Sequence, residues 1–98
     1  MYKEILKLKE MLEKEHIPFS FKSLFGGYHI IYPGKGQTVC SVIEHECSYG
    51  REDDLLEIQG LLTDDEKFDD DVLGYLSAEK VFGRIKADFE TRKNQLQV

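Results

Sequence analysis

The sequence contains no tryptophan, only two cysteines and only two prolines. Two cysteines without a Cys-x-x-Cys pair supply neither the four ligands of a structural zinc site nor a disulfide framework. There is no run of 18 apolar residues, so no transmembrane helix is expected. The first residues also lack the apolar stretch of a signal peptide. We therefore expect a cytoplasmic protein, not bound to membranes, with Cys40 and Cys47 as thiols and with no metal or other cofactor.

The composition is that of an ordinary globular chain, with 41% hydrophobic and 33% charged residues. Ninety-eight residues are enough for one hydrophobic core, so a single domain is expected over residues 1–98. Six phenylalanines and five tyrosines supply bulky side chains for that core. We therefore expect the chain to fold without a metal or disulfide.

Hydrophobic periodicity predicts a helix followed by strands. Ile5, Leu8 and Leu12 recur at helical spacing, and Pro18 disfavours helical angles before it, so a helix is expected over residues 2–16. Between residues 19 and 62 the period becomes two, and short turn sequences separate four segments. These segments favour four strands in an antiparallel meander.

The C-terminal third predicts a second helix, for which Ser77 is a candidate N-cap. Residues 63–71 are expected to form a loop, because they are too acidic for a core. Residues 55–60 favour a strand over a short helix, and residues 72–76 could be strand or helix. The expected fold is α+β, a four-stranded meander with the N-terminal and C-terminal helices packed on one face (α-β-β-β-β-α). Its predicted core consists of Leu8, Leu12, Phe21, Ile30, Val42, Ile58, Phe82, Ile85 and Phe89.

Negative charge is concentrated in one part of the chain. Residues 52–71 contain ten acidic side chains and a single cation, Lys67, within a chain of net charge −6. Such a segment repels phosphates, which disfavours general nucleic-acid binding, whereas it complements a basic protein surface. Its simpler interpretation is a solvated loop that aids solubility. The candidate partner-binding residues are Asp53, Asp54, Asp64, Asp65, Glu66, Asp69, Asp70 and Asp71.

A second group of residues leaves an enzyme or a metal-binding protein as an alternative. His45 and Cys47 share one face of the third predicted strand, and His29 lies on the strand before it. Glu44 and Glu46 alternate along the same strand, about 7 Å apart, where a carboxyl pair could act as acid and base. We expect both glutamates to face solvent and predict no catalytic activity.

Aromatic residues on the predicted sheet provide a third alternative. Tyr28 and Tyr32 alternate on the second strand and could stack on nucleic-acid bases. Few basic residues accompany them, so this alternative predicts only weak binding.

Two stretches of the chain carry a resemblance to known sequences. The first runs from Tyr28 to Gly50 and is centred on Cys-Ser-Val-Ile-Glu-His. The second covers residues 56–82 and contains Leu-Glu-Ile-Gln-Gly-Leu-Leu-Thr and Val-Leu-Gly-Tyr-Leu-Ser-Ala-Glu-Lys-Val-Phe. They are similar to a family of small uncharacterised proteins of phages and prophages of Gram-positive bacteria. The resemblance brings no known activity and no functional residues. It implies an accessory protein that acts in a bacterial host cell. Together with the acidic segment, it predicts a non-catalytic module that binds a host or phage protein.

Overall fold

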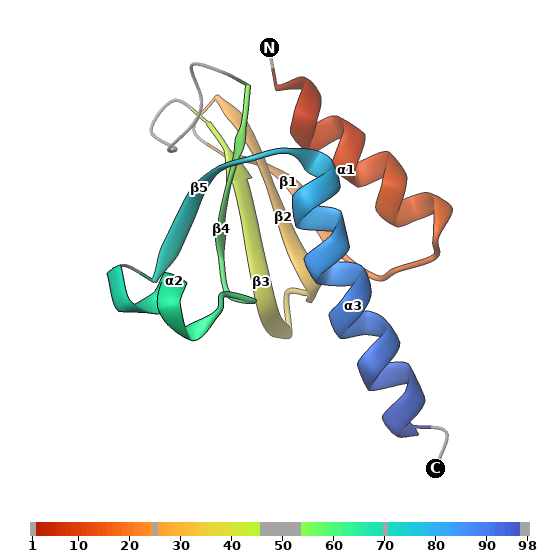
Figure 1. Cartoon of the computed structure of the whole chain (residues 1–98). Helices are drawn as coiled ribbons and strands as arrows, with labels where there is room; N and C mark the ends of the chain where they lie inside the picture. The colour runs from red at the N-terminus through yellow and green to blue at the C-terminus, as the bar shows by residue number, and fades with distance from the viewer. Residues whose placement is uncertain (1, 25, 46–53, 70, 97–98) are drawn as a thin grey trace.

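The structure, a computed structural model, describes residues 2–24, 26–45, 54–69 and 71–96 (Figure 1). No helix in these ranges is both long enough and apolar enough to cross a membrane. The fold is α+β, as predicted. Its elements are α1 (Lys3–Lys14), β1 (Ser20–Leu24), β2 (Gly27–Gly34), β3 (Gln37–Glu44), β4 (Leu56–Gln59), α2 (Asp64–Asp69), β5 (Val72–Leu76) and α3 (Ala78–Leu96).

The strands form one antiparallel sheet in the order β1-β2-β3-β4-β5. The predicted meander is confirmed, but the predicted number of four strands is wrong because Val72–Leu76 adds β5 beside β4. The register of this pair shifts between Leu56 and Ile58, and Tyr75 has a positive φ of 60°. This bulge breaks the alternation of buried and exposed side chains in β5, so the sequence pattern alone left strand and helix both possible.

The core lies between the sheet and the helices α1 and α3, which cover the same face of the sheet (Figure 1). Ile30, Val42 and Ile58 are neighbours across β2, β3 and β4, and each is at most 1% exposed. The helices contribute fully buried side chains such as Leu8 and Ile85. Burial of the predicted core is therefore largely confirmed. Phe21, Phe82 and Phe89 are the exceptions, because they pack against the core but are only partly buried.

The two long helices lie side by side and run in the same direction along the sheet (Figure 1). Lys7 of α1 pairs with Glu79 near the start of α3, and Glu15 pairs with Lys86 about two helical turns further along both helices. The carboxylate of Glu4 accepts a hydrogen bond of 2.9 Å from the first backbone N–H of α3, that of Ala78. Side chains of α1 therefore set the position at which α3 begins.

The acidic segment is not the loop that its composition predicts. Six of its residues form α2, which lies between β4 and β5. Thr63 and Glu66 make reciprocal hydrogen bonds at its start: the Thr63 N–H donates to Glu66 Oε1 at 2.8 Å, and the Glu66 N–H donates to Thr63 Oγ1 at 3.2 Å. This is the capping box expected of Thr-x-x-Glu, a local signal that outweighs the high charge of the segment.

Candidate functional site

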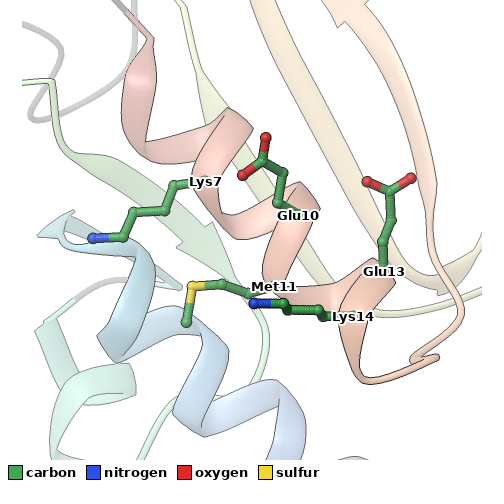
Figure 2. A pocket seen from close by; sticks show the side chains of 5 residues that line it. All are labelled: Lys7, Glu10, Met11, Glu13 and Lys14. Atoms are coloured by element: carbon green, nitrogen blue, oxygen red, sulfur yellow. The ribbon is translucent and has the colours of Figure 1, made fainter.

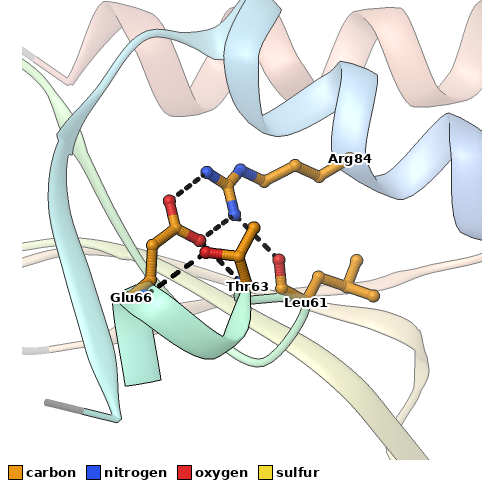
Figure 3. A network of polar contacts seen from close by, with 4 residues as sticks. All are labelled: Leu61, Thr63, Glu66 and Arg84. Atoms are coloured by element: carbon orange, nitrogen blue, oxygen red, sulfur yellow. Dashed lines mark hydrogen bonds and ion pairs between the residues drawn. The ribbon is translucent and has the colours of Figure 1, made fainter. Parts of the chain in front are cut away.

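The acidic helix α2 is fixed to α3 by one arginine (Figure 3). Arg84 donates from Nη1 to Glu66 Oε1 at 2.8 Å and from Nη2 to Glu66 Oε2 at 2.7 Å. Nη1 also donates to the carbonyl oxygen of Leu61 at 2.8 Å, just before α2. This planar two-point contact restrains both the position and the orientation of α2.

Glu66 is consequently held as a carboxylate. The hydrogen bonds from Arg84 lower the pKa of Glu66 to about 2, and the Thr63 N–H contributes in the same direction. Glu66 thus makes internal contacts with Arg84 and Thr63, although it was among the candidate partner-binding residues.

The remaining acidic candidates occupy different environments. Asp64 and Asp65 are exposed on the first turn of α2, and Asp71 is exposed immediately before β5. Asp69 ends α2, and nothing is described of its side chain. Asp53 and Asp70 lie outside the described residues. We call Asp64, Asp65 and Asp71 the acidic face.

Asp54 lies away from α2 and contacts the first turn of α1. Its Oδ2 accepts a hydrogen bond of 3.1 Å from the backbone N–H of Lys3, while its Oδ1 is buried. An acidic side chain at this position satisfies a helix N–H group and interacts favourably with the helix dipole. Asp54 is thus a cap for α1, and only part of its side chain is exposed.

Glu44 at the end of β3 is fully buried, with an exposed fraction of 0%. The expectation that it faces solvent is wrong, because it continues the alternation in which Cys40 and Val42 face the helices. That alternation was available in the sequence and points Glu44 toward the core. Glu46, its expected partner, lies outside the described residues.

Glu44 and Asp54 form a coupled carboxyl pair beneath the start of α1. Burial, and in second place the neighbouring Asp54, raise the pKa of Glu44 to about 8. Burial opposes ionisation of Asp54 too, but the hydrogen bond with Glu44 and the N–H groups of Lys3 and Glu4 lower its pKa. Two neighbouring buried carboxyl groups do not both ionise readily, so we assign the proton to Glu44, whose pKa is raised, and the charge to Asp54, whose pKa is lowered.

The histidines do not join this carboxyl pair. His29 pairs with Ile43 in the register, on the face of the sheet opposite Glu44, where one ring nitrogen lies 2.6 Å from Ser41 Oγ. Burial lowers the pKa of His29, and the nearby charges of Lys22 and His45 act in the same direction, so the ring is neutral at pH 7. Ser41 was not singled out in the sequence, because only the pairing of β2 with β3 places it beside His29.

The described cysteine and histidine side chains that could form a thiol or metal site do not come together either. Cys40 is fully buried on the helix side of β3, and burial raises the pKa of its thiol to about 12, which disfavours a reactive thiolate. His45 is buried just after β3, and Cys47 lies outside the described residues. Within the described ranges, no three His, Cys, Asp or Glu side chains gather in a way that could hold a metal ion.

The predicted sheet tyrosines both face the helices. Tyr32 is 1% exposed, and its hydroxyl donates to Asp88 Oδ2 at 2.8 Å. Tyr28 stacks on Phe21 at 5.1 Å between ring centroids and meets Tyr2 edge-on at 6.1 Å. These ring contacts leave neither tyrosine as an open platform for bases.

A shallow groove of about 500 Å³ runs along α1, with Met11 turned toward α3 (Figure 2). Its other lining side chains are Lys7, Glu10, Glu13 and Lys14, in which the two signs of charge balance. Lys7 is already paired with Glu79 on α3, and Glu13 with Lys9. This groove therefore offers no concentrated charge for a ligand.

No protein-family model, curated protein sequence or solved structure matches this chain. The resemblance to phage and prophage proteins stays a prediction.

Proposed function

We propose that this protein is a non-catalytic binding module, of phage or prophage origin, that attaches through its acidic face to a basic surface of a host or phage protein. The observation that carries the proposal is the two-point contact between Arg84 and Glu66. It anchors α2, and with it the exposed side chains Asp64 and Asp65 on the first turn of that helix.

Anchoring matters because binding has an entropic cost. Charges on a loose loop must be ordered when the partner arrives, whereas charges on a fixed helix already have their spacing. The carboxylate of Glu66 is paired with Arg84, whereas the neighbouring Asp64 and Asp65 are exposed to solvent. The arrangement favours a partner whose Lys and Arg side chains match that spacing.

The charge of the acidic face also defines the expected kinetics. Exposed charges of one sign accelerate association with an oppositely charged surface, and salt screens that attraction over about 8–10 Å. Binding should therefore be fast at low salt and should weaken steeply as salt is added.

The test is capture of a partner from bacterial lysate at low and high salt by the protein and by a triple variant, Asp64→Asn, Asp65→Asn and Asp71→Asn. A control variant removes three acidic side chains from the exposed surfaces of the long helices, Glu10→Gln, Glu13→Gln and Glu90→Gln. We expect the first variant to lose the captured protein and the control to retain it. Equal capture by both variants at low salt would reject the acidic face as the binding surface.

A further variant separates anchored charge from charge alone. Arg84→Lys keeps the positive charge but cannot make the planar two-point contact with Glu66. If a fixed α2 is needed, Arg84→Lys should bind the captured partner more weakly although every acidic side chain is intact. Unchanged affinity would show that the charge of the segment suffices and that its anchoring plays no part.

A further inference from the structure

The C-terminal half of α3 extends past the end of the sheet (Figure 1). A groove of about 550 Å³ lies under this extension, against the connection between β2 and β3. Its size is within the range of small-molecule sites, which are about 300–1,000 Å³. The groove is separate from the acidic face, which belongs to α2 and the start of β5.

One part of the groove is apolar. It is lined by Phe89 of α3, by Pro18 and by Pro33, whereas Tyr32 borders it with only 1% of its surface exposed. Phe89 is only partly buried against the core, although Tyr32 is almost completely buried. Aromatic and proline rings are rigid surfaces, so a flat apolar ligand can cover them with little loss of side-chain entropy.

The lining of the groove also includes two cations, Arg92 and Lys93 on the last turns of α3, and the polar Gln37. Arg92 donates from Nε to Asp88 Oδ2 at 2.8 Å, and the same oxygen accepts from the Tyr32 hydroxyl at 2.8 Å. This contact uses only one of the five N–H donors of Arg92. Within the part of the chain that the structure describes, its two terminal nitrogens make no hydrogen bond, which leaves them for an anionic group.

The local charges define the ligand. Asp88 offsets one of the two cations, and Lys93 makes no ion pair with the described residues. The groove thus has about one net positive charge beside an apolar surface. A single anionic group on an apolar body satisfies both parts at once, whereas a polyanion would meet the charge of Asp88.

We propose that this groove binds a small organic monoanion with an aromatic or branched apolar body, whose carboxylate or sulfonate is held by Arg92 and Lys93. The apolar body lies on Phe89 and the proline rings. Asp88 and Tyr32 orient Arg92 and do not contact the ligand's anionic group.

The probe for this site is 8-anilinonaphthalene-1-sulfonate, an aromatic monoanion whose fluorescence rises in apolar surroundings. We expect saturable one-to-one binding to the folded protein and displacement by 4-phenylbutyrate, a smaller aromatic monoanion whose anionic group is a carboxylate. Amide chemical-shift changes in the nuclear magnetic resonance spectrum should be confined to residues 17–19, 32–37 and 89–93. Shifts centred elsewhere, or binding without saturation, would overturn the proposal.

Matched variants test the charge. The double variant Arg92→Gln and Lys93→Gln should bind the probe about tenfold more weakly. The control Lys22→Gln and Lys80→Gln removes the same charge from exposed positions outside the groove and should bind normally. N-phenyl-1-naphthylamine, which lacks the sulfonate, should bind weakly to the unmodified protein. Equal affinity for the neutral and anionic probes would contradict a role for the cations.

Phe89→Leu tests the apolar part without emptying the partly buried position. It should weaken probe binding while thermal unfolding shows a retained fold. Unchanged affinity in a folded Phe89→Leu protein would place the probe away from Phe89 and overturn the proposed orientation.

Discussion

Arg84 and Glu66 join two helices through parallel hydrogen bonds of 2.8 and 2.7 Å, and Glu66 at the same time caps the helix to which it belongs. Acidic side chains also cap the other two helices. Asp54 accepts a hydrogen bond from the backbone N–H of Lys3 in α1, and Glu4 accepts one from the first backbone N–H of α3. Part of the acidity of this chain is therefore structural. The acidic face is exposed, and it is the surface that we propose for a partner.

The contact between Arg84 and Glu66 predicts a specific dependence on acid. The pKa of Glu66 is lowered from 4.5 to about 2, so its contribution to stability is present above pH 4.5 and is lost as the pH falls through 2. Glu66→Gln should lower stability at neutral pH and approach the unmodified protein near pH 2. Hydrogen exchange of the α2 amides against pH checks this. Glu10→Gln, on the exposed side of α1, should show no such convergence.

Glu44 predicts a pH dependence of stability that is opposite to that of Glu66. Burial raises its pKa from 4.5 to about 8, so the folded protein holds a proton that the unfolded chain loses above pH 4.5. Stability should therefore fall between pH 4.5 and 8 with a slope of up to about 1.4 kcal/mol per pH unit from this group.

Glu44→Gln removes that titration and can still donate a hydrogen bond to Asp54. We expect the variant to be more stable than the unmodified protein at pH 8, with a flatter profile between pH 4.5 and 8 in urea unfolding. Parallel profiles for the two proteins would show that Glu44 is not protonated in the folded state.

A pair of leucines on α1 tests the helix–sheet core. Leu12 is 0% exposed, whereas Leu6 is 40% exposed. Leu12→Ala should lower the free energy of unfolding by about 2–5 kcal/mol, because it leaves a cavity in a packed core. Leu6→Ala should change it by about 0.5 kcal/mol or less. Denaturant unfolding of both variants is the measurement, and similar losses would contradict the orientation of α1.

Two glycines should respond to alanine in opposite ways. Gly83 lies within α3, and an added Cβ would meet nothing within 4 Å, so Gly83→Ala should stabilise the protein by about 0.5–1 kcal/mol. At Gly27 the Cβ would lie 1.9 Å from the carbonyl oxygen of Glu44, so Gly27→Ala must displace the end of β3. Melting temperatures should rise for the first variant and fall sharply for the second. A stable Gly27→Ala protein would show that β2 and β3 approach less closely at this point.

Local sequence signals were sufficient for much of the fold. The recurrence of Leu8 and Leu12 predicts α1, and Ser77 marks the start of α3, where its Oγ accepts from the Lys80 N–H at 3.3 Å. These features depend on neighbours within one turn of helix or along one strand. The Thr63-x-x-Glu66 pattern is also a local helix signal, but the acidic composition of residues 63–71 favoured the prediction of a loop. In β5 the bulge at Tyr75 removed the alternation that would have identified the strand.

The sequence by itself thus determined the α+β class, the antiparallel meander and the helical spans at both ends, because periodicity and turns act over a few residues. Only the tertiary structure decided which acidic groups are internal. Glu44 meets Asp54 because α1 covers the end of β3, and Arg84 reaches Glu66 because α3 passes beside α2. The groove at Phe89 likewise requires α3 to extend past the sheet. Such contacts depend on how distant segments pack, which no local pattern specifies.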